Sequence, residues 1–165
     1  MINELSSSVA VFSLDTAKLE QIASQTAGGE PLSPSNAKLQ TLTMIQNIDT
    51  VPSAFPLELN TCGRICSHPS GRYVIVSNRG HESIAILKVS KKTGLLSQVG
   101  FFHTFGFTPR HFQFDASGQF LIVANQDSDC INVFKFNLSS GELTFTGNKY
   151  HCPSPNFVQC VGQGS

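Results

Sequence analysis

Hydrophobic and polar positions alternate in short runs along most of the chain, and such runs are typical of β-strands. Between residues 108 and 147, four segments rich in β-branched and aromatic residues stand between polar turns: 110–114, 120–125, 130–137 and 143–147. The turns 115–118 and 138–141 contain the Asp, Ser and Gly residues that turns favour. Helical periodicity is weak and confined to residues 16–23. The pattern predicts an all-β protein of short antiparallel strands.

The strand pattern is repeated along the chain. Segment 70–78 aligns with 117–125, and 84–89 aligns with 131–136, both with a spacing of 47 residues and without a gap. Partial copies flank this pair: residues 3–12 match 78–87, residues 38–41 match the start of a fourth strand, and 154–159 match 108–113. Segment 24–37 is rich in Gly, Pro and Ser and is predicted to be an inserted surface loop.

Four antiparallel strands in a repeat of this length are typical of a β-propeller blade. We therefore expect residues 1–165 to form one partial domain, an incomplete β-propeller of four-stranded antiparallel blades. It would contain about two full blades plus parts of two others. A β-sandwich also has many short strands, but it does not explain a repeat of turns and strands at constant spacing.

Charge and composition narrow the classes of partner. Lys and Arg total 11, Asp and Glu total 11, and no basic stripe indicates nucleic acid. No apolar run approaches the roughly 20 residues that span a bilayer, and the N-terminal residues do not resemble a signal peptide. We expect a cytoplasmic protein without a membrane or nucleic-acid partner.

The five cysteines do not form a Cys-x-x-Cys pair. Cys62 and Cys66 could hold a metal only if other ligands joined them, and buried free thiols are the preferred interpretation. We therefore expect neither a metal nor a cofactor.

Polar residues are expected to gather at one rim of the propeller. Because the chain reverses at each turn, the first strand of a blade starts at the rim where the second strand ends. This rim would receive 3–4, 78–81 and 125–127 from second strands, and 63–64, 108–111 and 155–156 from first strands. The opposite rim carries Ser-Gly turns at 70–71 and 117–118 and is expected to be chemically plain. Glu4, Arg79 and Gln126 differ at equivalent positions, which indicates a site and not scaffolding.

Several rim residues have a structural interpretation beside the functional one. The recurrence of asparagine at positions 3, 78 and 125 favours a structural cap. Arg79 pairs with Glu4 or Glu82, or binds a ligand. His111 is either a structural or a catalytic histidine, and Arg110 suits an anion because its planar fork matches phosphate or carboxylate. The remaining three, Gln126, Asp127 and Asp129, could simply form turns.

Taken in order, these segments resemble a known family. Residues 77–84, 108–112 and 124–129 resemble signature stretches of the lactonase-type seven-bladed β-propellers, and residues 3–7 resemble another. That family includes 6-phosphogluconolactonases and carboxy-cis,cis-muconate cyclases. The resemblance implies a domain of at least twice this length, so the chain would be a C-terminal fragment. The missing blades would come from the full-length chain or from a partner.

The resemblance also implies a reaction, the cofactor-free hydrolysis of a sugar lactone in carbohydrate metabolism. Glu4 or His111 would be the base, and Arg79 would act with them in catalysis. The substrate-binding candidates are His81, Arg110, Gln126 and Asp127. A muconate-type cyclase would use the same residues in the reverse sense.

The chain departs from the family at two positions of one inner strand. Arg64 stands where relatives tend to carry an acidic residue, and Cys66 stands where they tend to carry a histidine. These departures favour a non-catalytic interaction platform as an alternative. A separate alternative is an inactive fragment that does not fold alone.

Overall fold

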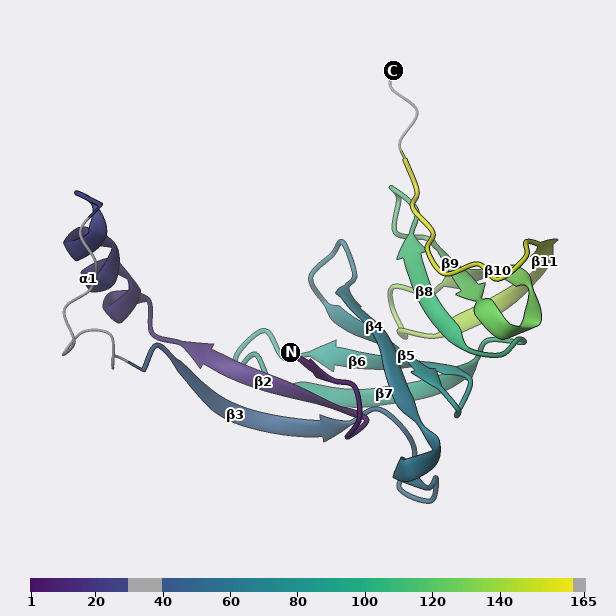
Figure 1. Cartoon of the computed structure of the whole chain (residues 1–165), viewed down its shortest axis with the longest axis horizontal. Helices are drawn as coiled ribbons and strands as arrows, with labels where there is room; N and C mark the ends of the chain where they lie inside the picture. Colours follow the sequence, from purple (N-terminus) through teal and green to yellow (C-terminus); the bar gives the residue numbers. More distant parts are fainter. Residues whose placement is uncertain (30–39, 162–165) are drawn as a thin grey trace.

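Three antiparallel sheets make up the computed structural model, which describes residues 1–29 and 40–161 (Figure 1). The first sheet contains β1 (Ile2–Asn3), β2 (Ser8–Leu14) and β3 (Leu42–Asp49). The second contains β4 (Thr61–Ser67), β5 (Tyr73–Arg79), β6 (Ser83–Val89) and β7 (Leu96–His103). The third contains β8 (Pro109–Phe114), β9 (Phe120–Asn125), β10 (Cys130–Phe136) and β11 (Leu143–His151). Two four-stranded blades and one partial blade confirm the predicted all-β architecture.

The strand boundaries agree with the sequence prediction at three of the four strands of the last blade to within one residue. The exception is β11, which continues to His151, whereas the prediction ended at Gly147. Gly147 has a φ of +81°, and the β10–β11 register shifts between Asn132 and Phe134. The glycine therefore forms a bulge within the strand and does not end it.

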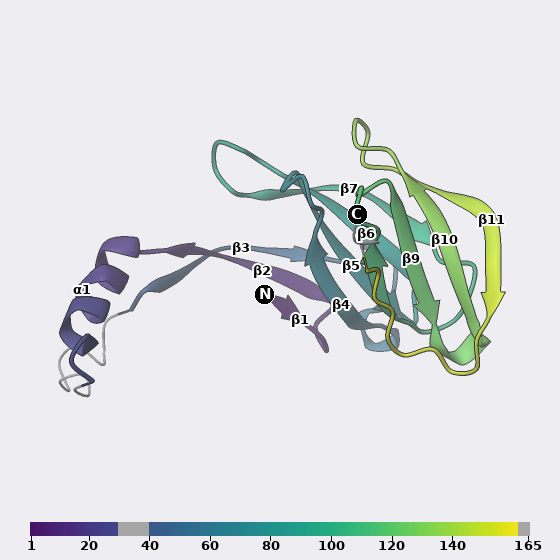
Figure 2. The ribbon, with the colours of Figure 1, turned by 90° about the horizontal axis from the view of Figure 1, so that it is seen from above.

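Helix α1 (Thr16–Thr26) lies at the far end of the β2–β3 hairpin, away from the two four-stranded sheets (Figures 1 and 2). Asp15 caps it by accepting a hydrogen bond from the Lys18 amide at 3.0 Å. None of its residues is buried. The helix extends into the segment 24–37 that was predicted to be a loop, and residues 30–39 of the chain lie outside the described residues.

Apolar side chains fill the two boundaries between neighbouring blades. Between the second and third sheets, Tyr73 and Phe112 are fully buried in one cluster with Ile75, Leu121 and Phe134. Between the first and second sheets, a smaller cluster is formed by Val9, Cys62, Val76, Ala85, Leu87 and Leu96. Each blade is thus stabilised mainly by the face of its neighbour.

In each blade, one backbone hydrogen bond ties the turn between the second and third strands to the residue that follows the fourth strand. Ser7, Glu82 and Asp129 occupy equivalent positions and have φ values of 49°, 54° and 48°. Their carbonyl oxygens accept hydrogen bonds of 2.8–3.0 Å from the amides of Thr50, Thr104 and Cys152, in that order. A left-handed residue is uncommon outside glycine, so its recurrence shows that the turn is part of the blade scaffold.

Segment 154–159, predicted to begin another blade, is not a strand in the structure. It runs beside β8 (Figure 1), where the Val158 amide donates to Nδ1 of His111 at 3.2 Å. A first strand pairs with the second strand of its own blade, and no described segment offers that partner. Among the described residues, no helix is long and apolar enough to cross a membrane.

Candidate functional site

The inner strands β4 and β8 carry a polar cluster at the boundary between the two complete blades. Nη1 of Arg64 lies 2.6 Å from Nε2 of His111, and Nη2 donates to Oε1 of Gln113 at 3.1 Å. Because side chains two positions apart share one face of a strand, His111 and Gln113 present a matched pair to the guanidinium. Arg64 thus links two blades through side-chain contacts.

Arg64 is held in place by its backbone and its surroundings. Its amide donates to Oγ of Ser77 at 3.0 Å, and its Cζ lies 5.9 Å from the ring centroid of Phe112. The neighbouring Gly63 allows this approach, because a Cβ there would lie 2.7 Å from Ser77 Oγ and 3.0 Å from the Pro109 carbonyl oxygen. The buried Nε of Arg64 has no partner among the described residues.

His111 is kept neutral by its environment. Burial lowers the pKa of the ring, and the positive charge of Arg64 lowers that pKa further. Both ring nitrogens face donors, since Nε2 meets the guanidinium and Nδ1 meets the Val158 amide. A neutral imidazole accepts at only one nitrogen, so the other nitrogen, which carries the proton, also faces a donor. The ring of Phe157, whose centroid is 4.3 Å away, covers this histidine.

A second charged pair lies at the rim near the start of β4. Arg79 forms an ion pair with Glu4, and its Nη2 also donates to the Cys62 carbonyl oxygen at 2.7 Å. The side chain of Arg79 is 18% exposed and that of Glu4 is 61% exposed. The ion-pair interpretation with Glu4 is confirmed, and no such pair forms with Glu82.

Glu82 instead holds two backbone amides. It accepts hydrogen bonds from Gly80 at 3.0 Å and from Thr108 at 2.6 Å. Burial raises the pKa of this carboxyl, although both amide bonds oppose the rise. Glu82 is therefore a structural residue that fixes the connector between the two complete blades.

His81 lies at the predicted rim, where its amide donates to Oδ1 of Asn60, the residue before β4, at 3.0 Å. Its Nδ1 lies 2.7 Å from Ser83 Oγ, and its ring centroid lies 4.8 Å from that of Phe55 and 5.8 Å from that of Phe101. Burial, followed by the charge of His103, lowers the pKa of the ring. The structure places this predicted substrate-binding residue in an aromatic cluster at the β5–β6 turn, and no sequence pattern indicated such packing.

The other three predicted binding residues lie at the rim of the last blade. Arg110 is exposed at the start of β8. Gln126 and Asp127 belong to a short 3₁₀ turn, η2 (Gln126–Ser128). Gln126 donates to Ser154 Oγ at 3.4 Å, and Asp127 accepts from Thr108 Oγ1 at 2.5 Å. These contacts fit the turn-forming interpretation, and substrate binding by the three stays a prediction.

The recurrent asparagines are structural, as their recurrence indicated. Asn78 is fully buried and donates to the Thr50 carbonyl oxygen at 2.5 Å. Asn125 is also fully buried and donates to the Thr104 carbonyl oxygen at 3.3 Å. Asn3 donates to Ser8 Oγ at 3.0 Å.

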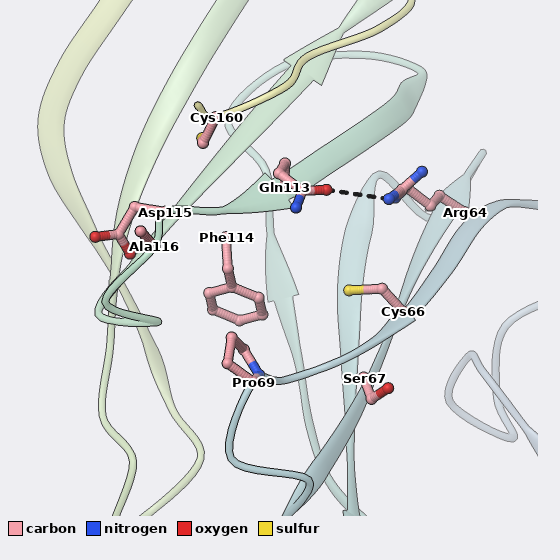
Figure 3. Close-up of a pocket in the computed structure, with 9 residues that line it drawn as sticks. All are labelled: Arg64, Cys66, Ser67, Pro69, Gln113, Phe114, Asp115, Ala116 and Cys160. Carbon is pink, nitrogen blue, oxygen red and sulfur yellow. Dashed lines mark hydrogen bonds between the residues drawn. The ribbon is translucent and has the colours of Figure 1, made fainter. Parts of the chain in front are cut away.

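A cavity of about 270 Å³ opens beside Arg64 (Figure 3). It extends along β4 and β8 away from the predicted rim and is lined by Arg64, Cys66, Ser67, Pro69, Gln113, Phe114, Asp115, Ala116 and Cys160. Figure 3 shows Gln113 directed towards Arg64, with Cys66 below them. Gln113 was not predicted, and its spacing of two from His111 was the signal that could have identified it. Arg64 was noted only as a departure from the family.

The cysteines are free thiols of differing burial. Cys62 and Cys130 are buried, as expected, whereas the other three are half-buried: Cys66, Cys152 and Cys160. Burial raises the pKa of Cys66 to about 11, so this thiol is protonated at neutral pH. Within residues 1–29 and 40–161, no group of three or more His, Cys, Asp or Glu side chains could hold a metal ion.

Comparison with known proteins decides the family. The sequence matches the family described as "Lactonase, 7-bladed beta-propeller" over residues 1–160. The chain belongs to this lactonase family. The predicted resemblance is therefore confirmed.

Lactonase relatives are found among curated proteins and solved structures. A 6-phosphogluconolactonase of Formosa agariphila is 43% identical over 77 residues, which are 46% of this chain and 22% of that protein. A 6-phosphogluconolactonase of Bacillus subtilis is 32% identical over 119 residues, or 72% of this chain and 34% of that protein. The structure of a periplasmic gluconolactonase of Pseudomonas aeruginosa has a TM-score of 0.74 and 26% identity, over 96% of this chain and 38% of that one. The matched part of this lactonase chain covers about a third of the length of its relatives.

Proposed function

We propose that this chain contributes two blades and part of a third to a complete lactonase propeller that hydrolyses a sugar lactone, as a 6-phosphogluconolactonase does. The observation that carries the proposal is the family match over residues 1–160, together with relatives named 6-phosphogluconolactonase. The remaining blades would come from a full-length chain or from a partner. We place the reaction in the cytoplasm, although one structural neighbour is described as periplasmic.

Opening of a lactone by water needs three groups. A base takes a proton from the attacking water, positive charge stabilises the oxyanion that forms on the carbonyl, and the ring oxygen leaves with a proton. Arg64 belongs to β4 and Arg79 contacts the Cys62 carbonyl oxygen of that strand, so both supply positive charge near the inner strands. Arg110, exposed at the same rim, would hold a phosphate or carboxylate of the substrate.

Glu4 is the first candidate for the base. One carboxylate oxygen pairs with Arg79, and the other has no hydrogen-bond partner among the described residues. The ion pair orients the carboxylate, and its exposure leaves it accessible to water. Glu4 and Arg79 would therefore act as a unit, with the base and the cation positioned by one contact.

His111 is the second candidate. Its Nε2 is engaged by Arg64, so it can accept a proton only when the guanidinium turns to another acceptor. The carbonyl oxygen of a bound lactone would be such an acceptor. The depressed pKa of His111 suits a base that must be neutral before it acts.

A non-catalytic interaction platform is the second candidate function. It is favoured by Arg64, which stands at the position where an acidic residue was expected. The guanidinium contacts both His111 and Gln113 and so engages the polar groups of these side chains. In that case, the polar cluster would lock two blades together and perform no chemistry. A muconate-type cyclase, which forms a lactone in place of opening one, would use the same residues.

The test is hydrolysis of 6-phosphogluconolactone by the complete protein, and the rate is measured from the acid that the reaction releases. Glu4→Gln and Arg79→Gln should each reduce kcat/KM by about 100-fold or more. Lys149→Gln, a change of one exposed residue on β11, is the matched control and should leave the rate unchanged. If the folded wild-type protein opens no lactone, the enzyme proposal is wrong and the platform stands. Lactone formation from a muconate without hydrolysis would assign the cyclase reaction.

A further inference from the structure

A second polar cavity lies at the opposite rim, which the sequence predicted to be chemically plain. It has a volume of about 360 Å³ and is lined by Arg72, Lys88, Val89, Ser90 and Lys91. In the β5–β6 ladder, Tyr73 pairs with Lys88 at this end, and Asn78 pairs with Ser83 at the end near Arg79. The cavity is therefore separated by the length of β5 from the pair proposed for catalysis, and that prediction of a plain rim is wrong.

The charge of this cavity is entirely positive. Three of its five lining residues are cations, and no carboxylate lines it. None of the three forms an ion pair with a described residue. The two ion pairs among the described residues, Lys18–Asp15 and Arg79–Glu4, both lie elsewhere in the molecule. The sequence contains no Asp or Glu between Glu82 and Asp115. A chain without net charge thus concentrates unneutralised positive charge in one hollow.

The blade scaffold does not require these cations, because the next blade makes the same turn without them. The backbone amide of Ser90 donates to the Leu95 carbonyl oxygen, and the Ser90 carbonyl oxygen accepts from the Gly94 amide, both at 2.8 Å. The equivalent Asn137 makes the same two backbone bonds. Its amide donates to the Glu142 carbonyl oxygen at 2.9 Å, and its carbonyl oxygen accepts from the Gly141 amide at 2.7 Å.

The side chains differ although these backbone bonds agree. The Val89 amide donates to the Arg72 carbonyl oxygen at 2.9 Å, and the Phe136 amide donates to that of Gln119 at 2.8 Å. Arg72 and Lys91 thus correspond to the uncharged Gln119 and Leu138, and only Lys88 keeps a charged counterpart, Lys135. Such divergence at equivalent positions is the mark of a site and not of scaffolding.

The cavity is also preorganised. The Cζ of Arg72 lies 5.7 Å from the ring centroid of Tyr73, a contact in which the aromatic face attracts the cation. Tyr73 is itself fully buried, and its hydroxyl donates to the Leu138 carbonyl oxygen at 3.1 Å. The turn that carries Lys91 is fixed by the two Ser90 backbone bonds. A ligand would therefore meet cations whose supports are already ordered.

We propose that this basic cavity is a binding site for a phosphate group, held by Arg72, Lys88 and Lys91. A guanidinium and two ammonium groups suit the several charged oxygens of a phosphate ester or polyphosphate. The volume falls in the range of about 300–1,000 Å³ found for ligand sites. The proposed phosphate site depends neither on the lactonase reaction nor on its substrate, so it can be tested separately from the proposed function.

Calorimetric titration of the complete protein with inorganic tripolyphosphate tests the site. We expect saturable binding that weakens about tenfold in Lys88→Gln and again in Arg72→Gln, since hydrogen bonds to charged groups are of this strength. The substitution Arg72→Gln introduces the residue that the next blade carries at the equivalent position. Lys135→Gln removes the counterpart of Lys88 and should leave binding unchanged.

Three results would overturn the site: no saturable binding of either tripolyphosphate or the vesicles described next, an equal loss in Lys135→Gln, or a loss in Arg79→Gln with none in Lys88→Gln. A second arm identifies the source of the phosphate group, with phosphatidylcholine vesicles that carry phosphatidylinositol bisphosphate. Vesicle binding that depends on Lys88, without binding of tripolyphosphate, would support the site and assign it to a lipid headgroup. Binding of tripolyphosphate alone would assign it to a soluble ligand.

Discussion

Arg64 Nη1 lies 2.6 Å from His111 Nε2, so a cation on one blade faces an imidazole on the next. The contact joins β4 to β8 where two complete blades meet, and after burial it is the second cause that lowers the pKa of the histidine. The positive charge of the guanidinium opposes a charge on His111, and its N–H group presents a donor to Nε2 whichever ring nitrogen carries the proton.

Replacing Arg64 by Gln should therefore raise the pKa of His111. Burial lowers that pKa first and would remain, but the second cause, the neighbouring positive charge, would be gone. Nuclear magnetic resonance of the histidine ring protons during a pH titration measures the change. An unchanged pKa for His111 would contradict the contact.

The free energy of unfolding should decrease as the pH falls below about 6.5, the pKa of a histidine in an unfolded chain. The folded-state pKa values of His81 and His111 lie below the unfolded value, so the unfolded chain binds protons first. Stability is fully present above the unfolded pKa and is lost as the pH falls through the folded pKa. Glu82, with its raised pKa, opposes this loss at lower pH.

Urea unfolding at several pH values measures this dependence. The slope of stability against pH should be smaller in His111→Gln than in the wild type, since one of the two responsible histidines is removed. A transition that is cooperative also shows that the chain folds alone, whereas a featureless slope would show that the other blades are required. A slope of the opposite sign would contradict the assignment of both histidines.

Substitution of Gly63 by Ala should lower the free energy of unfolding by about 1–3 kcal/mol, as overpacking does. The added methyl would meet Ser77 Oγ at 2.7 Å and the Arg110 carbonyl oxygen at 3.1 Å. The hydroxyl could turn away only by losing its bond from the Arg64 amide, and the carbonyl oxygen could withdraw only if β8 moved. Gly28→Ala is the matched control, because no atom lies within 4 Å of a Cβ there. Equal stability of Gly63→Ala and the wild type would refute the close approach of β4 and β8.

Asn78→Ala should cost more stability than Asn125→Ala, although the two asparagines occupy equivalent positions. Oδ1 of Asn78 accepts from Asn60 at 3.3 Å, whereas Oδ1 of Asn125 is buried without a partner. Asn78→Ala should lower the free energy of unfolding by about 2–3 kcal/mol, and Asn125→Ala by about 1 kcal/mol. The second cost is smaller because removing the unsatisfied Oδ1 of Asn125 recovers part of the cost of burying it. Urea unfolding of the two variants compares them directly, and the reverse order would contradict this reading of the bonds.

The blades could be predicted because their strands and turns repeat with a constant spacing, and the spacing survives divergence of the side chains. The ion pair of Glu4 and Arg79 could also be anticipated, since the meander brings the ends of second strands to one rim. The contact of Arg64 with His111 could not, because it depends on how closely two inner strands approach, and Gly63 controls that distance. The packing of His81 could not be predicted for a similar reason. Its position at a strand end indicated the rim, but the aromatic rings of Phe55 and Phe101 draw the side chain into a cluster of their own.

The basic cavity was missed because the sequence shows its members in three separate places. Arg72 precedes β5, Lys88 belongs to β6, and Lys91 follows it in the turn. Only the antiparallel register, which sets Tyr73 opposite Lys88, brings the three together.

Helix α1 contains no buried residue and stands at the tip of a hairpin whose strands pair from Ser8 with Asp49 to Leu14 with Leu42. The fold therefore has a natural handle. A fluorescent reporter or an affinity tag inserted within Thr16–Thr26 would extend from the hairpin tip without displacing any core side chain. The propeller could then be immobilised, purified or followed in cells with both chain ends, the rim and the basic cavity left as they are.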